Sequence, residues 1–361
     1  MSTKPVVAIA MSGGVDSSVA AALLVEQGYT VMGMMLNLWN EQDSERSNRC
    51  CTPDSMALAR RVASILSIPF YVLDARQIFF DSVVRPFIDG YARNRTPNPC
   101  ITCNRIVRWD FLLNHALAAG ADFLATGHYA RITQNPDLSF QLSRGVDPSK
   151  DQSYVLHVLT QQQLKHALFP LGAYIKQEVR QLAREFNLPV AERPDSQDLC
   201  FVGTSGDYRQ FLTRHAPHTQ NPGLIMDQQG IVLGQHQGLA FFTIGQRKGL
   251  HLTSPVPLYV LAKDRHRNAL IVGTSEQLGG NQLVAEGVNW IDGYPPESPL
   301  HALVKVRYKS HDFPGLVHIM SKDTIRVEFA DTLRDITPGQ AAVLYNGDIC
   351  LGGGIISDPT N

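Results

Sequence analysis

The chain has 361 residues, of which 44% are hydrophobic and 18% charged, with a formal net charge of −1 at pH 7. This composition excludes an intrinsically disordered chain and a uniformly basic nucleic-acid coat, and the length predicts two or three domains. No apolar run is long enough to span a bilayer, and the first residues lead straight into a predicted strand. We therefore expect no membrane contact, no signal peptide and a cytoplasmic location.

The first predicted strand, Val6–Ala10, leads into Ser12-Gly13-Gly14-Val15-Asp16-Ser17-Ser18 and then into a predicted helix that ends at Gly28. Two glycines let backbone amides turn toward a ligand, the serines add hydroxyl donors, and the electropositive start of a helix attracts anions. The spacing is neither the Walker A pattern nor the G-x-G-x-x-G of a dinucleotide fold. The stretch predicts a phosphate-binding loop, with a tight turn that serves geometry alone as the alternative.

Strands and helices then alternate. Further strands are predicted at residues 30–36, 70–73 and 123–126, a loop at 37–49, and helices at 56–66, 77–91 and from Asn104 to 119–120. Two prolines, Pro97 and Pro99, interrupt helical structure at residues 95–100. This order predicts an α/β fold with a doubly wound parallel sheet. Its ligands are expected beyond the carboxyl ends of the strands, where Ser12, Leu36 and Gly127 fall.

After residue 150 the regular alternation of strands and helices ends. Helices are predicted at residues 151–159 and 175–186, followed by an irregular polar run at 193–201. From about Pro222 the chain consists of short β-runs punctuated by glycine, which predict a small β-rich domain. After a proline-rich link at 294–299, strands at 302–308, 316–320, 324–329 and 341–345 predict a small barrel. We predict three domains: residues 1–205, 206–277 and 278–361.

Six cysteines are present: Cys50, Cys51, Cys100, Cys103, Cys200 and Cys350. In a reducing compartment, catalytic or metal-binding roles outrank a disulfide framework. Cys103 shares a loop with Cys100, which favours a functional role for Cys103. For Cys200, a buried structural thiol and a functional thiol are equal alternatives. Five arginines and a single acid between residues 85 and 108 indicate a local polyanion site.

The chain carries, in this order, SGGVDSS, TPNPCITCNRIV, ATGHYAR, KDQSYVL, DSQDLCFVG, GLAFFTIGQRKGL, VKVRYKS and TPGQAAVLYNGDICLGGG. The first string resembles the PP-loop of ATP pyrophosphatases, and the ordered set resembles the bacterial tRNA-specific 2-thiouridylases over essentially the whole chain. The resemblance implies an ATP-dependent sulfurtransferase that turns the C2 carbonyl of the wobble uridine, tRNA position 34, into a thiocarbonyl. It implies ATP and Mg²⁺ as cofactors, and tRNA and an upstream sulfur-carrier protein as partners. A monomer is expected, with the third domain contacting tRNA.

The resemblance also implies roles for single residues. ATP would be bound by Ala10, Met11, Ser12, Gly13, Gly14, Val15, Asp16, Ser17, Leu36 and Gly127. Cys200 would carry a persulfide and Cys103 would be its partner thiol, with a lowered pKa from the helix start after Asn104 and from Arg105 and Arg108. The uridine would be flipped out and held by Asn98, Pro99 and Cys100. The tRNA contacts would be His128, Lys150, Asp151, Gln152, Arg307, Tyr308 and Gln340.

Several alternatives stay open at this point. His128 can be a structural histidine, and Arg307 with Lys305 and Lys309 can simply form the solvent face of a strand. Many family members carry aspartate where this chain has Cys100, so the acid or base is undetermined. A less favoured arrangement uses Cys100, Cys103 and Cys200 to hold an iron-sulfur cluster. The alternative functions are a PP-loop ligase or amidotransferase acting on a small carboxylic acid, and a non-catalytic RNA-binding protein.

Overall fold

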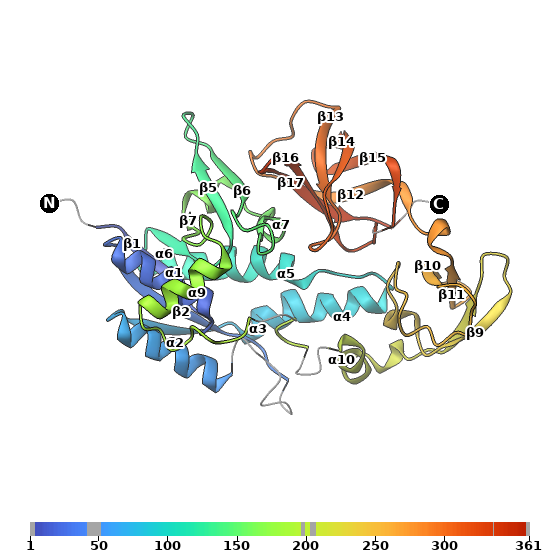
Figure 1. Cartoon of the computed structure of the whole chain (residues 1–361), viewed down its shortest axis with the longest axis horizontal. Helices are drawn as coiled ribbons and strands as arrows, with labels where there is room; N and C mark the ends of the chain where they lie inside the picture. The colour runs from blue at the N-terminus through green and yellow to red at the C-terminus, as the bar shows by residue number, and fades with distance from the viewer. Residues whose placement is uncertain (1–3, 42–51, 196–198, 203–206, 335, 359–361) are drawn as a thin grey trace.

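The structure is a computed structural model, and it describes residues 4–41, 52–195, 199–202, 207–334 and 336–358. Cys50, Cys51 and most of the predicted loop at 37–49 lie outside the described residues. Figure 1 shows a domain built on a parallel sheet, a β-barrel beside it and a smaller β-domain at the far end. The predicted fold class, α/β followed by two β-rich units, is confirmed.

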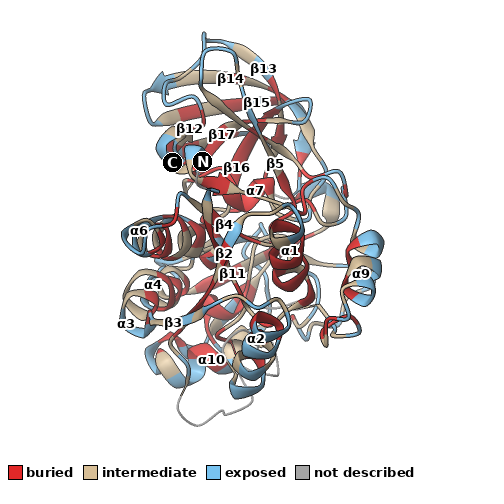
Figure 2. Ribbon diagram, turned by 90° about the vertical axis from the view of Figure 1, so that its left-hand side faces the viewer, coloured by how far each residue is buried: buried red, intermediate tan, exposed pale blue. Residues whose placement is uncertain are grey.

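The first domain is organised around a five-stranded sheet of order β3-β2-β1-β4-β7, in which all paired strands are parallel. The central strand, β1 (Val6–Ala10), is apolar throughout, and its three middle residues are fully buried because helices cover both faces of the sheet. Figure 2 shows this buried layer between the helices. The other strands are β2 (Thr30–Asn37), β3 (Phe70–Asp74), β4 (Phe123–Ala125) and β7 (Ala167–Leu168).

Helices α1 (Val15–Glu26) and α2 (Pro53–Ile65) follow the first two strands. A longer helical run comprises α3 (Arg76–Phe79), the π-helix η1 (Phe80–Val84) and α4 (Arg85–Ala92), and α9 (Lys176–Glu185) packs against α1. A second run comprises α5 (Pro99–Thr102), the π-helix η2 (Cys103–Leu112) and α6 (Leu113–Ala118). It begins at Pro99, because the Asn98 side chain accepts a hydrogen bond from the Cys100 amide at 3.1 Å and caps the helix. The predicted start after Asn104 is therefore wrong.

One hairpin is absent from the sequence-based prediction. Strands β5 (Ala130–Gln134) and β6 (Phe140–Arg144) pair antiparallel, and the helix predicted over 151–159 is reduced to α7 (Ser153–Leu156) before α8 (Gln161–Lys165). The buried Asp151 carboxylate accepts hydrogen bonds from the amides of Gly145 and Ser153, both at 3.1 Å. These bonds hold Asp151 in a turn before the helix, so that α7 begins only at Ser153.

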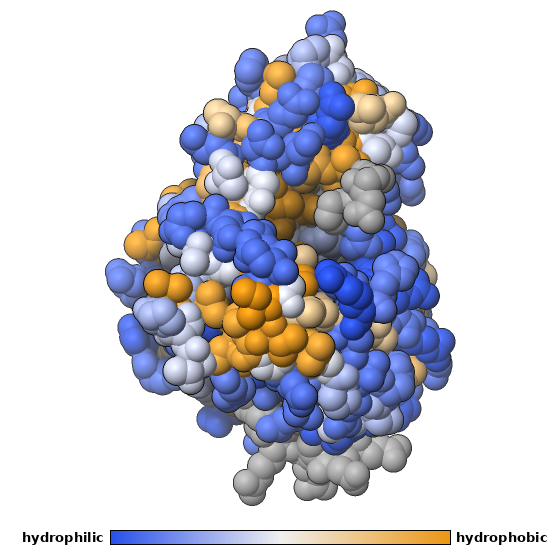
Figure 3. Space-filling model, turned by 90° about the vertical axis from the view of Figure 1, so that its right-hand side faces the viewer, coloured by the Kyte–Doolittle hydropathy of each residue, from blue (hydrophilic) through white to orange (hydrophobic). Residues whose placement is uncertain are grey.

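The second unit is a small sheet of order β10-β11-β8-β9. Its strands are β8 (Gly223–Met226), β9 (Val232–His236), β10 (Tyr259–Asp264) and β11 (Ala269–Gly273), preceded by α10 (Tyr208–His215) and accompanied by the 3-10 turns η3 (Pro217–Thr219), η4 (Leu239–Phe241) and η5 (Ser275–Gln277). The turn before β9 and its first residues expose Ile231, Val232 and Leu233. Figure 3 shows an apolar area on this end of the molecule.

The third unit is a closed barrel of order β12-β15-β14-β13-β16-β17, which an additional β12–β17 pairing completes. Its strands are β12 (Gly280–Trp290), β13 (Leu300–Lys305), β14 (Phe313–Ser321), β15 (Thr324–Leu333), β16 (Ala341–Asn346) and β17 (Ile349–Ile356). Alternate residues such as Val304, Val317 and Val327 point into the barrel and are fully buried. The predicted barrel is confirmed.

The hairpin of the first domain is also part of the barrel's sheet. Strand β6 pairs antiparallel with β17, and Figure 1 shows the β5–β6 hairpin rising beside the barrel. Arg144 at the end of β6 pairs with Asp312 at 2.9 Å and lies over the Tyr345 ring, with its guanidinium carbon 3.7 Å from the ring centroid. Backbone pairing and this cation contact together fix the barrel to the first domain. In the described part of the chain no helix is both long enough and apolar enough to cross a membrane.

Candidate active site

The predicted phosphate-binding loop lies between β1 and α1, at the carboxyl edge of the sheet. Its hydroxyl groups define its shape: the Ser12 amide donates to Ser17 Oγ at 3.1 Å, and Ser18 Oγ donates to the Gly14 carbonyl at 2.8 Å. Among the described residues no side chain caps α1 at its N-cap, Gly14. The first amides of the helix have no intrahelical acceptor, so the loop can present them to an anion.

Two glycines let neighbouring segments approach this loop closely. Gly13 has φ +71°, and a Cβ there would lie 2.3 Å from the carbonyl oxygen of Ser55 in α2. A Cβ on Gly127, after β4, would lie 2.8 Å from the amide nitrogen of Ser17. Only glycine fits at either point, which leaves the backbone donors open toward a polyphosphate such as that of ATP.

Charged side chains from distant parts of the chain converge on the loop. Asp16 accepts hydrogen bonds from the Tyr129 hydroxyl and from Lys176 Nζ, both at 2.7 Å. Lys176 also pairs with Asp195 at 3.0 Å, and Asp195 pairs with Lys150 and Arg180 at 2.8 Å each. Burial alone would raise the pKa of Asp195, but the hydrogen bonds from Lys150 and Lys176 outweigh it and lower the pKa to about 2.

A further arginine connects the segment that precedes Cys200 to the same loop. Arg193 donates to the Gly13 carbonyl at 2.6 Å and to Ser55 Oγ at 2.8 Å. Sequence reasoning missed this set, which consists of Tyr129, Lys176, Arg180, Arg193 and Asp195. One feature of the sequence pointed to Lys176. It is the first residue of α9, where the helix dipole disfavours a cation, so a lysine at this position needs a reason other than helix stability.

The two thiols of the predicted sulfur transfer lie against one apolar cluster, called here the junction cluster. It includes the buried aromatic side chains of Phe79, Phe87, Tyr91, Phe201 and Phe211, and the half-buried Cys103 and Cys200 pack against it, as does Leu36. Cys100 is exposed. Among the described residues, no group of three or more His, Cys, Asp or Glu side chains is placed to hold a metal ion. The iron-sulfur alternative stays a hypothesis.

The loop before Asn98 is held by the barrel. Gln340 Nε2 donates to the Thr96 carbonyl at 2.8 Å, and the Thr96 amide donates to the Pro338 carbonyl at 3.1 Å. Arg95 pairs with Asp358 at 2.9 Å. The predicted target-base residues Asn98, Pro99 and Cys100 therefore follow directly on a segment that the third domain positions.

His128 is buried beside the sheet edge, and both of its ring nitrogens are engaged. Arg108 donates to Nε2 at 3.0 Å, and Nδ1 lies 2.7 Å from Thr126 Oγ1. Burial and the neighbouring Arg108 guanidinium hold the pKa of His128 well below its ordinary value. The ring is neutral with its proton on Nδ1, because a guanidinium can only donate.

The other predicted tRNA residues have partners within the protein. Lys150 pairs with Asp195, the Gln152 side chain accepts from the Tyr129 amide at 3.1 Å, and Asp151 is only 5% exposed. Arg307 donates to the carbonyl of Ile244 at 3.0 Å and to Thr337 Oγ1. Tyr308 is half-buried, and burial, then Asp151 and Cys100, raise its pKa to about 12. Their contacts with RNA stay predictions.

Acidification should destabilise this protein through its buried histidines. Burial lowers the pKa of His157 to about 4, whereas the unfolded ring titrates near pH 6.5. Below pH 6.5 the unfolded chain binds a proton that the folded chain excludes, so the free energy of unfolding falls as pH falls. For His157 the expected loss between pH 7 and pH 5 is about 2 kcal/mol.

Urea unfolding at both pH values checks this expectation. His157→Gln should show a smaller difference between the pH 7 and pH 5 midpoints than the wild type, whatever its absolute stability. The exposed His301 offers a control, because His301→Gln should keep the wild-type difference. Equal differences in all three proteins would contradict the assignment.

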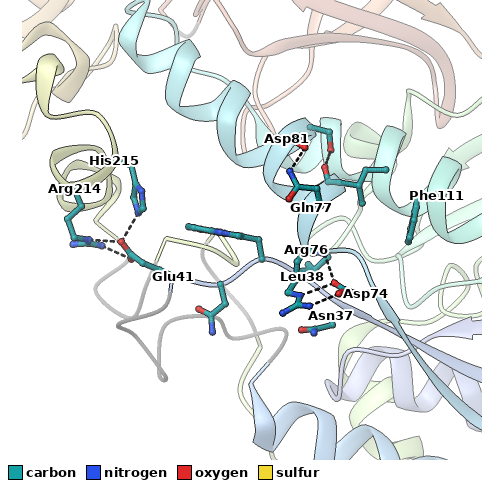
Figure 4. A pocket seen from close by; sticks show the side chains of 14 residues that line it. Asn37, Leu38, Glu41, Asp74, Arg76, Gln77, Asp81, Phe111, Arg214 and His215 are labelled. Atoms are coloured by element: carbon teal, nitrogen blue, oxygen red, sulfur yellow. Dashed lines mark hydrogen bonds and ion pairs between the residues drawn. The ribbon is translucent and has the colours of Figure 1, made fainter.

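A large open cavity of about 1520 Å³ lies beyond the ends of β2 and β3. Figure 4 shows Glu41 on one side of it, held by Arg214 at 2.8 Å and His215 at 2.7 Å. On the other side Arg76 pairs with Asp74 at 2.6 Å. The lining begins at Asn37, one residue after the predicted nucleotide residue Leu36. The cavity thus adjoins the strand end where the adenosine was expected.

Comparison with known proteins gives one consistent result. The chain matches the family models described as tRNA methyl transferase HUP domain over residues 5–204, tRNA methyl transferase PRC-barrel domain over 209–274 and Aminomethyltransferase beta-barrel domain over 280–356. It is 48% identical to a tRNA-specific 2-thiouridylase MnmA of Magnetococcus marinus over 97% of this chain and 98% of that protein. It is 45% identical to one of Natranaerobius thermophilus over 98% of each.

Among solved structures, the chain is similar to a 4-thiouridine synthetase in complex with RNA and ATP, with 14% identity and a TM-score of 0.37. That similarity covers 59% of this chain and 50% of the other, and it is too remote to carry an argument.

Proposed function

The chain belongs to the family of tRNA-specific 2-thiouridylases, and we propose on this premise that it replaces the C2 oxygen of the wobble uridine, tRNA position 34, by sulfur. It is an ATP-dependent tRNA sulfurtransferase. The three domains are proposed to be residues 1–205 for catalysis, 206–277 as a central unit and 278–361 for tRNA contact. We propose also that it acts as a monomer in the cytoplasm.

The first step activates the base. The C2 oxygen of uracil is a poor leaving group, so it attacks the α-phosphorus of ATP and pyrophosphate leaves, which converts the oxygen into a phosphate ester. The residues proposed to hold ATP are those of the loop from Ala10 to Ser17, with Leu36 and Gly127. The open amides at the start of α1 and the glycine contacts support this placement. Mg²⁺ would neutralise phosphate charge, and Asp16 is the carboxylate on the loop that could bind it.

The second step delivers sulfur. The terminal sulfur of a Cys200 persulfide attacks C2, and AMP leaves with the original oxygen. The Cys103 thiolate then attacks Cys200 Sγ and forms a disulfide, which a reductant must clear, while the transferred sulfur stays on the base. In the alternative order Cys103 attacks first and frees sulfide. A sulfur-carrier protein would reload Cys200.

The tRNA is proposed to be held by the catalytic domain and the barrel together. The flipped uridine would lie at Asn98, Pro99 and Cys100, whose preceding loop the barrel positions through Gln340 and Pro338. Further contacts are proposed from His128, Lys150, Asp151, Gln152, Arg307, Tyr308 and Gln340.

The observation that carries the proposal is that Leu36, Cys103 and Cys200, far apart in the chain, pack against one apolar cluster. This common packing surface supports the proposal that the nucleotide residue Leu36 and the two thiols serve one reaction. Pyrophosphate release tests the function: it should be stimulated by tRNA lacking the 2-thio group and unaffected by amino acids. Stimulation by a small carboxylic acid, with none by tRNA, would instead favour a PP-loop ligase.

A further inference from the structure

The charged cluster beside the phosphate-binding loop contains a lysine with no role in the mechanism above. Lys176 belongs to α9, and its backbone amide donates to Asp147 Oδ2 at 2.9 Å. Its side chain is 12% exposed, and Nζ lies 2.7 Å from Asp16 Oδ1 and 3.0 Å from Asp195 Oδ1. The Tyr129 ring lies on a further side, with its centroid 5.9 Å from Nζ.

This placement is costly for a purely structural lysine. The first position of a helix is electropositive, so a cation there is disfavoured, and burial of the side chain adds a desolvation cost. Residues that break such local preferences are expected at functional sites. The amino group is also aimed at the loop through the loop's own carboxylate, Asp16.

The cluster has a surplus of positive charge. The cluster holds four cations: Lys150, Lys176, Arg180 and Arg193. It holds three carboxylates, those of Asp16, Asp195 and the nearby Asp147, so one positive charge is not balanced among these side chains. Three of the four cations share the single carboxylate of Asp195. A polyphosphate on the loop would compete with this carboxylate for their donors.

We propose that Lys176 is a further catalytic residue of this enzyme, which exchanges its Asp195 contact for the β- and γ-phosphates of ATP and stabilises the leaving pyrophosphate. This inference rests on the proposed function, because it assumes that ATP binds at the loop. Lys176 then supplies a positive charge that the loop's backbone amides lack, and Asp195 holds the amino group in place until the phosphates arrive.

Binding of ATP and of AMP to the full-length protein, measured without tRNA, tests the proposal. Lys176→Met should weaken ATP binding at least tenfold and leave AMP binding within about twofold, because AMP lacks the β- and γ-phosphates. Lys176→Arg, which keeps the charge, should restore ATP binding to within about threefold of the wild type.

The variant Asp195→Asn distinguishes two roles of Lys176: a contact with the phosphates of ATP, and a purely structural bridge between Asp16 and Asp195. If Lys176 binds phosphate, removal of the competing carboxylate should retain or tighten ATP binding. If Lys176 only bridges two carboxylates, Asp195→Asn should weaken ATP binding as Lys176→Met does, and this would overturn the inference.

Two other results would also overturn it. The first is wild-type ATP affinity in Lys176→Met, and the second is an equal loss of ATP and AMP affinity. In both cases the thiouridylase proposal would stand. A wild-type protein that binds no ATP would refute the inference together with the assigned nucleotide site.

Discussion

Cys200→Ser is expected to abolish tRNA thiolation, with a loss of at least about a thousandfold, while tRNA affinity stays within about twofold. A serine hydroxyl cannot carry a persulfide, so no sulfur can be loaded, whereas the shape of the side chain barely changes. Cys103→Ser should be equally inactive, because without the partner thiol the S–S bond to Cys200 is not cleaved and the sulfur is not left on the base. Thiolated nucleoside would be quantified after digestion of the tRNA.

Cys350 serves as a control, and Cys100 tests the iron-sulfur alternative. Cys350 in β17 is 1% exposed, and burial raises its pKa to about 12, so Cys350→Ala should keep normal turnover. Cys100→Ala examines the iron-sulfur alternative, because it would remove a cluster ligand and make activity and iron content fall together. Normal turnover in Cys200→Ser or Cys103→Ser would show that the sulfur-transfer role of that residue is wrong.

Gly13→Ala is expected to reduce ATP affinity by about two orders of magnitude. A Cβ at Gly13 would lie 2.3 Å from the Ser55 carbonyl oxygen, so the loop or α2 must move, and a shift of about 1 Å at a catalytic loop can cost a hundredfold. The left-handed backbone of Gly13 adds about 1–2 kcal/mol of strain for any residue with a Cβ.

Gly120→Ala is the matched control for that strain. Gly120 has φ +87°, close to that of Gly13, but a Cβ there would meet nothing within 4 Å. Its substitution should lower stability slightly and leave ATP affinity unchanged. An equal loss of ATP affinity in both variants would mean that backbone strain causes the loss, and that the close approach of Ser55 to the loop does not.

The strand, loop and helix around Ser12 were predictable because all their determinants are consecutive in the chain. Strand β1, two glycines, hydroxyl donors and helix α1 follow within some twenty residues, and local chemistry fixes each of them. The alternation of strands and helices likewise predicted the parallel sheet, and the short β-runs after Pro222 predicted the two β-rich units. The start of the helix at Pro99 also has local determinants in Asn98 and Pro99, although the two prolines led us to predict an irregular segment over residues 95–100.

The β5–β6 hairpin was harder to predict because its stability depends on a distant partner. Residues 135–139 contain turn-forming Asn, Pro and Asp, which was the available signal. The pairing of β6 with β17 joins residues more than 200 positions apart, and no local pattern encodes it. Propensity therefore predicted a longer helix after residue 151, where the tertiary structure places a buried carboxylate with backbone partners.

The sequence by itself determined the loop between β1 and α1, the order of the three units and, through its ordered motifs, the family. Only the tertiary structure decided which side chains surround the loop. Lys176 reaches Asp16 across 160 residues, Arg193 reaches Gly13 across 180, and Gln340 reaches Thr96 across 244. The reason is physical: backbone conformation and burial pattern follow from neighbouring residues, whereas ion pairs and domain contacts form between elements that only folding brings together.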